Sequence, residues 1–138
     1  MKKQLFFLML IAGCMLAFTG CSKDDDDASI EGRWNAKSEI GKYSVNGVEE
    51  IDEDTYAPGE YEIAFNDGKF VEYYEGEVDD EGSYSVSGDK LTYDYGDGDK
   101  EVVTIKTLNS NTLVLFSEYN YTDGGITYSG SEETTFTR

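Results

Sequence analysis

The sequence contains no histidine, only two cysteines and one proline, and far fewer basic than acidic residues. Without histidine the chain lacks the commonest general base and any Ser–His or Cys–His pair. A zinc site built from Cys and His is excluded for the same reason. Eleven Lys and Arg stand against 29 Asp and Glu, giving a net charge of −18 at pH 7. Nucleic-acid binding needs clustered Lys and Arg on the phosphates, so that class of function is also excluded.

The beginning of the chain has the pattern of a secretory signal peptide. Lys2 and Lys3 form a basic start, and an almost wholly apolar run follows over residues 5–18. Small residues come next, as they do before a cleavage site. The run is shorter than the roughly 20 residues that a membrane-spanning helix needs. We therefore expect residues 1–20 to be a cleaved signal.

The residues around the expected cut resemble the lipobox of bacterial lipoproteins: Phe18, Thr19, Gly20 and Cys21. A smaller aliphatic residue is usual in the place of Phe18. Cys14 also follows a lipobox-like pattern, but cleavage there would truncate the apolar run. The resemblance implies cleavage before Cys21 and acyl chains, palmitate among them, on that residue, which would anchor the chain firmly to a membrane. The alternatives are an ordinary signal with Cys21 as a free thiol, or an uncleaved anchor.

An acidic tether follows the cysteine over residues 21–29. The run Asp24–Asp27 cannot bury itself and repels itself, so we expect an extended, solvated segment. It also resembles the acidic export signal of surface lipoproteins in some gut-dwelling Gram-negative bacteria. That resemblance implies the outer membrane of a Gram-negative cell envelope, with the domain exposed at the cell surface.

Residues 30–138 predict one all-β domain. Tyr61, Ile63 and Phe65 alternate onto one face, and Asn66-Asp67-Gly68 is a strong hairpin signal. Further short runs lie at 70–74, 83–87, 91–95, 102–108, 113–116 and in the final stretch. Their spacing predicts an antiparallel up-and-down meander of about eight strands. Such a sheet has exposed edges unless it closes, which favours a barrel. Between residues 41 and 58, Asn46-Gly47 could turn a short hairpin, while residues 51–56 predict an acidic loop.

An ordered set of motifs resembles the small lipocalin-like domains of secreted bacterial lipoproteins. The motifs are Gly32-x-Trp34 and the runs 65–70, 82–91, 112–115 and 135–138. The resemblance implies a lipocalin-like barrel over residues 30–138. It further implies that Trp34 closes one barrel end and that Arg138 stacks on it.

The tyrosines suggest what the barrel holds, because each gives apolar area and one polar tip. The expected inward-facing, ligand-binding residues are Tyr61, Ile63, Phe65, Tyr84, Val86, Leu91 and Tyr93. A barrel of eight strands is wide enough either to be filled by side chains or to hold one small ligand. Short strands and bulky residues favour the filled interior.

Two hypotheses of function follow. In the first, a surface-anchored module binds a small apolar or amphipathic molecule; in the second, a solid barrel uses its acidic exterior to bind a basic protein partner. We expect no enzyme, since a carboxylate-based hydrolase would need two acids in one cleft. Asp94, Asp97, Asp99 and Glu101 crowd one hairpin but do not match an EF-hand, so we expect no metal and no cofactor.

Overall fold

The computed structural model describes residues 28–138, all of which lie in strands, turns or short connections. The expected signal over 1–20, Cys21 and the run Asp24–Asp27 lie outside the described residues. Among the residues described, no helix is long and apolar enough to cross a membrane. The strands are β1 Gly32–Val45, β2 Val48–Thr55, β3 Tyr61–Asn66, β4 Lys69–Tyr74, β5 Glu77–Ser87, β6 Lys90–Gly96, β7 Asp99–Leu108, β8 Thr112–Asp123 and β9 Ile126–Thr137.

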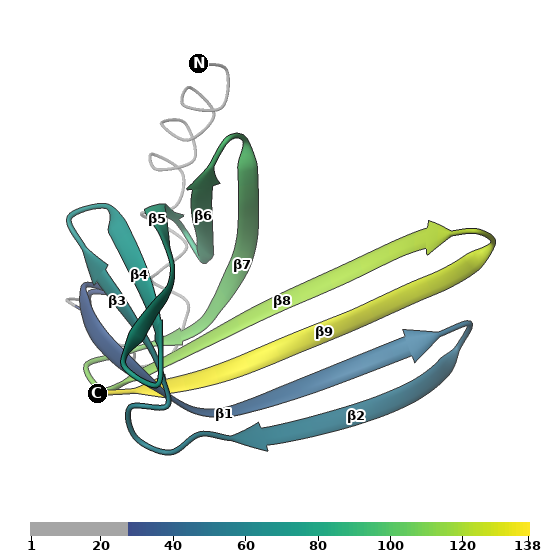
Figure 1. Ribbon diagram of the computed structural model, residues 1–138, viewed down its shortest axis with the longest axis horizontal. Coiled ribbons are helices and arrows are strands. Elements are labelled where there is room, and N and C mark those ends of the chain that lie inside the picture. Colours follow the sequence, from purple (N-terminus) through teal and green to yellow (C-terminus); the bar gives the residue numbers. More distant parts are fainter. Residues whose placement is uncertain (1–27) are drawn as a thin grey trace.

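All nine strands belong to one antiparallel sheet, in the order β2-β1-β3-β4-β5-β6-β7-β8-β9. Pairing of β1 with β9 closes β1 and β3–β9 into a barrel, leaving β2 outside the ring. Apart from β2, neighbours in the chain are neighbours in the sheet. The predicted all-β, up-and-down barrel is therefore confirmed, with one extra strand (Figure 1).

Four strands continue beyond the barrel as a single-layer sheet, which we call the arm (Figure 1). The arm consists of β2 and of residues 39–45 of β1, 117–123 of β8 and 126–133 of β9. β1 first pairs with β3, over Gly32–Asn35, and then with β2, over Ser38–Val45. The arm forms because β1 changes partner along one edge while β9 follows it on the other edge.

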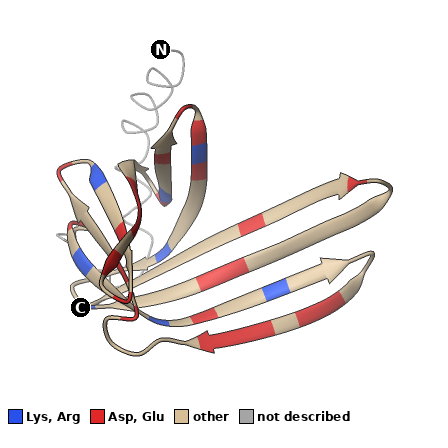
Figure 2. Cartoon of the chain, viewed as in Figure 1, with Lys and Arg blue, Asp and Glu red and all other residues tan. Residues whose placement is uncertain are grey.

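The prediction of an acidic loop over residues 51–56 is wrong, since residues 51–55 belong to β2. Asn46 and Gly47 make the tight turn into it, both with positive φ (51° and 82°). Every side chain of β2 is exposed, and Figure 2 shows acidic residues along most of the strand. Strand pairing joins main-chain groups, so an acidic segment forms a strand where both of its faces meet water.

Aromatic and aliphatic side chains fill the barrel. The largest fully buried ones are Trp34, Phe65, Phe70, Ile63, Leu91 and Leu113. Burying a side chain of this size stabilises the fold by about 1.5–3 kcal/mol. Because these side chains fill the middle of the barrel, a ligand would have to bind nearer one of its ends.

One end of the barrel is closed by Trp34 and Arg138. The Arg138 guanidinium lies 4.0 Å from the centre of the Trp34 ring, and the indole nitrogen donates to the Ile30 carbonyl (2.7 Å). Arg138 also donates to the carbonyls of Glu31, Ser29 and Ser110. This end is sealed, so access from solvent is at the opposite end, beside the arm.

Candidate functional site

Strand register brings carboxylates to the inner face of the barrel at its open end. Glu72 pairs with the buried Ile63, so both side chains point inward. By the same rule Glu101 shares a face with Tyr93. Glu132 lies two residues before the buried Thr134 on β9 and also points inward. These acids form the rim of the open end, above the apolar core.

A β-bulge adds a further carboxylate from β1. The register between β1 and β9 shifts between Ala36 and Ser38, so the alternation set by Trp34 and Ala36 reverses beyond it. Glu39 therefore faces inward, and it accepts hydrogen bonds from the hydroxyls of Tyr56 (3.1 Å) and Thr134 (3.4 Å). Without the bulge, Glu39 would lie on the outside of the barrel.

A small cavity of about 90 Å³ lies among these groups. It is lined by Tyr61, Glu72, Tyr93, Tyr95, Glu101, Val103, Leu115, Phe116, Ser117, Glu132, Thr134 and Phe136. Pockets for small molecules usually measure about 300–1,000 Å³. The cavity can admit a small head group, while the rest of a ligand would have to lie at the rim.

Burial and mutual repulsion shape the charge state of the rim. Desolvation, reinforced by Asp80, raises the pKa of Glu72 to about 7, against an opposing hydrogen bond from Tyr61. Desolvation and the nearby Glu39 also raise the pKa of Glu132. At neutral pH Glu72 is therefore only partly ionised, and burial opposes negative charge at both Glu72 and Glu132.

No basic side chain neutralises this charge within the described structure. The ion pairs there join Arg33 to Glu62, Lys100 to Asp94 and Lys106 to Glu133. By strand alternation these lie on the outer face of the barrel, not on the inner face that carries the rim acids. The same residues include no group of three or more acidic or cysteine side chains placed to hold a metal ion. An organic cation with an apolar body is the ligand chemistry that fits carboxylates set among tyrosine rings.

The residues expected to bind a ligand divide into three groups. Tyr61 and Tyr93 line the cavity. Ile63, Phe65 and Leu91 are buried in the core below it. Tyr84 and Val86 are half-buried and pack against the core, and the Tyr84 hydroxyl donates to Glu31 near the closed end.

The rim carboxylates on β1, β4, β7 and β9 were not predicted as residues of a binding site. Glu72, Glu101 and Glu132 are each an even number of positions from inward-facing residues of their own strands. Strand alternation alone could therefore have predicted that their side chains point inward. Glu39 carried none, because the bulge that turns it inward has no distinctive sequence.

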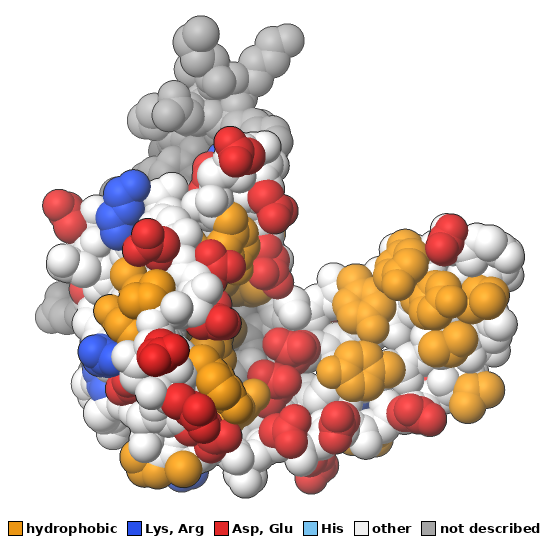
Figure 3. Space-filling model, in the orientation of Figure 1, with side chains coloured by type: hydrophobic (Ala, Val, Ile, Leu, Met, Phe, Trp, Pro, Cys, Tyr) orange, Lys and Arg blue, Asp and Glu red, His pale blue; other side chains and the backbone are white. Residues whose placement is uncertain are grey.

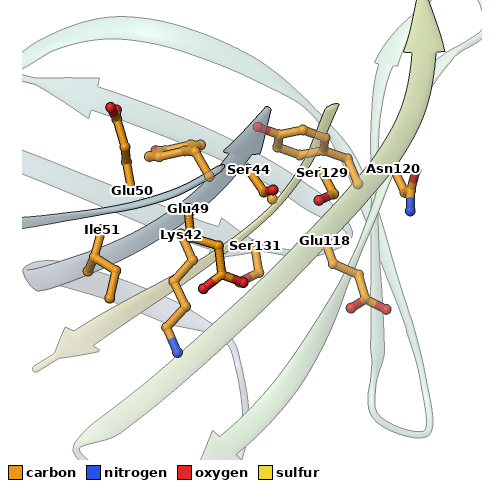
Figure 4. A pocket seen from close by; sticks show the side chains of 12 residues that line it. Lys42, Ser44, Glu49, Glu50, Ile51, Glu118, Asn120, Ser129 and Ser131 are labelled. Carbon is orange, nitrogen blue, oxygen red and sulfur yellow. The ribbon is translucent and has the colours of Figure 1, made fainter. Parts of the chain in front are cut away.

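A larger hollow of about 780 Å³ follows the arm, but it does not enclose a site. Figure 4 shows Glu50 on one side of the sheet and Ile51 and Lys42 on the other. Because its lining residues point to opposite faces of a single layer, this hollow is not a pocket.

The comparison with protein families agrees with this architecture. A family model described as a lipocalin-like domain matches residues 30–115, more than half of the chain. The chain belongs to the lipocalin-like family. The matched residues run from the start of β1 into β8 and include the rim residues Glu39, Glu72 and Glu101. Searches of curated proteins and of solved structures found no significant match.

In this lipocalin-like domain, side chains fill the barrel between its closed end and a small acidic recess at its open end. The site therefore combines tyrosine rings, which offer apolar faces, with carboxylates that have no basic partner among the described residues.

Proposed function

We propose that this protein is a lipid-anchored envelope lipoprotein whose lipocalin-like domain binds a small amphipathic amine at the open end of its barrel. The family supports ligand binding in general. The observation that carries the proposal is the convergence on one recess of tyrosines and of carboxylates that form no ion pair within residues 28–138. The solid core below that recess argues against a long apolar ligand threaded into the barrel.

The recess provides for the two parts of such a ligand. Its ammonium group would enter between Glu72, Glu101 and Glu132, where a charge-assisted hydrogen bond is stronger than in water. Its apolar body would lie against the rings of Tyr61 and Tyr95, which are partly exposed at the rim. Binding would neutralise repulsion that the free protein tolerates, and so would stabilise the fold.

We propose binding rather than catalysis. A carboxylate-based hydrolase must seat the scissile bond between two acids, with the substrate around it. The recess beside these carboxylates has a volume of about 90 Å³, well below the roughly 300 Å³ of the smallest usual ligand pockets. The raised pKa of Glu72 has a sufficient cause in burial and in the neighbouring Asp80.

The anchoring part of the proposal rests on Cys21 and the segment around it. Cells grown with an alkyne analogue of palmitate should label the chain, and Cys21→Ser should abolish the label. Protease added to intact cells should remove the domain if it lies at the cell surface. Labelling that persists in the Cys21→Ser variant would refute the assignment of the lipidated residue.

Amine binding can be measured by calorimetry on the full chain in zwitterionic lipid nanodiscs. Phenethylamine should bind saturably, and 2-phenylethanol, which lacks the charge, should not. Glu72→Gln combined with Glu101→Gln should weaken binding by about tenfold, the loss expected for charge-assisted contacts.

The matched control is Glu49→Gln combined with Glu53→Gln, which removes the same number of carboxylates from exposed residues of β2. It should leave binding unchanged. Equal binding of 2-phenylethanol, or an equal loss in the Glu49→Gln, Glu53→Gln control, would contradict a specific amine site at the rim.

A further inference from the structure

The arm has an apolar inner face with nothing packed on it in the described structure. Cross-strand register places Tyr43, Val45, Val48, Tyr119, Tyr121, Ile126 and Tyr128 on the face that continues the barrel interior. Val48 is 69% exposed and Tyr121 is 53% exposed. Figure 3 shows hydrophobic side chains gathered on the part of the arm that is farthest from the barrel. A contiguous patch of this kind marks an interaction surface.

Glycines beneath the rings give this face its shape. The Tyr43 ring lies against Gly41, and the Tyr119 ring lies against Gly130, in the space that a Cβ atom would occupy. The rings of Tyr121 and Tyr128 stack on each other, with centroids 5.1 Å apart and planes 16° apart. The aromatic side chains thus cover the sheet as a layer of ring faces and edges.

The opposite face of the arm is different in chemistry. By register it carries Lys42, Ser44 and Glu49, which alternate with the inner-face residues of their strands. Ser129, Ser131 and Glu118 continue this polar surface on β9 and β8. Ile51 and Ile40 are its exposed aliphatic residues. Only the inner face therefore combines a continuous aromatic layer with high exposure.

The charged residues on the inner face of the arm indicate what kind of partner could bind there. Glu50, Asp52 and Asp54 lie on this face of β2, opposite Tyr43, Gly41 and Glu39. Lys42 points to the other face. A second copy would bring like charges together, and an anionic membrane would be repelled. A chain with Lys or Arg among apolar residues would satisfy both the carboxylates and the rings.

We infer that the inner face of the arm is a docking surface for a basic, apolar-rich polypeptide segment of a partner protein. Apolar side chains of the segment would pack on Tyr119, Tyr121 and Tyr128, and its cations would contact ring faces and the β2 carboxylates. The segment would give the arm the second layer that a sheet with an apolar face ordinarily has. This surface is separate from the rim recess, and each can fail without the other.

The experiment uses the full chain in zwitterionic nanodiscs and a short fluorescent peptide in which lysine and valine alternate. We expect saturable binding that weakens steeply between about 0.05 and 0.5 M NaCl, as charge screening requires. Tyr121→Ser with Tyr128→Ser should weaken it by about tenfold, because aromatic anchors dominate such surfaces. Ile51→Ser, on the opposite face of the same arm, is the matched control and should bind like the unaltered protein.

Several results would overturn this inference. A lysine–serine peptide that binds equally well would show that charge alone acts. An equal loss in Ile51→Ser would show that the effect is general to the arm. Displacement of the peptide by a soluble neutral glucan, or tyrosine-dependent dimers in sedimentation, would assign the surface to a glycan or to a second copy. Thermal unfolding of each variant serves as the folding check, because it depends on neither the arm surface nor the rim recess.

Discussion

Arg138 joins the two ends of the described chain through a single side chain. Its guanidinium covers the Trp34 ring and donates to backbone carbonyls of the segment before β1 and of the turn before β8. Gly32 lies beneath it with a φ of +116°, and a Cβ there would come within 2.9 Å of the Arg138 side chain. The closed end therefore depends on a contact between residues far apart in sequence.

We predict that Arg138→Gln lowers the free energy of unfolding by about 1–2 kcal/mol, from the lost cation–π contact and charged hydrogen bonds. Urea unfolding followed by Trp34 fluorescence measures the change. Lys100→Gln, which removes an exposed ion pair with Asp94, should cost less than about 1 kcal/mol. A smaller loss for Arg138→Gln than for Lys100→Gln would contradict the role given to Arg138.

Glu72 should make stability depend on pH. Its pKa is about 7 in the fold against an ordinary 4.5, so the folded state binds more protons between these values, and its contribution to stability falls as pH rises from about 4.5 to 7. Because the group is partly exposed, we discount the full shift and expect Glu72→Gln to be about 1–2 kcal/mol more stable than the unaltered protein at about pH 8.

At about pH 4 the advantage of Glu72→Gln should nearly disappear, because the carboxyl is then mostly protonated in both the folded and the unfolded state. Thermal unfolding of both proteins at the two pH values measures the difference. An advantage of equal size at both values would show that the effect of the substitution is not the cost of burying charge.

At the scale of single residues, sequence alternation predicted the core well and the rim poorly. Ile63, Phe65 and Leu91 were expected to point inward, and all are buried. Glu72 and Glu132 share the inward parity of their strands, but an acid is most often a solvated surface residue. These acids differ from the others in their position in the fold. They lie at the open end of the barrel and are buried deeply enough to lose part of their hydration.

The arm is the element that sequence reasoning did not foresee. Its edge strand β2 consists mainly of acids, which have low strand propensity. Closure of the barrel was expected to remove sheet edges, whereas β2 and the outer half of β8 keep theirs. The acids on β2 protect that edge, since like charges oppose pairing with another copy.

We predict that the arm opens more readily than the barrel. The amides of β2 and of residues 117–123 should exchange with solvent faster than those of β3, β4 and β6, because the arm is a single layer with both faces exposed. Hydrogen exchange followed by mass spectrometry measures this directly. Equal protection of the arm and the barrel would contradict the description of the arm as a separate, less stable element.

For the whole molecule, the fold class followed from turn spacing and alternation, and the lipocalin-like family confirms it. The path by which β1 leaves β3 for β2 was not predictable, because nothing in its sequence marks a change of partner. The high negative charge was evident from composition, but its division between the rim and the inner face of the arm depends on strand register and the bulge in β1.

The central claim is that side chains fill the barrel core and that a small amine binds at the open end of the barrel. The most direct test is amide chemical-shift mapping on the isotope-labelled full chain, titrated with phenethylamine. We predict saturable shifts at Tyr61, Glu72 and Tyr95, with Phe65 and Leu91 unaffected. Shifts centred on Phe65 and Leu91 would show that the ligand enters the core, and shifts confined to the arm would place the binding site away from the rim.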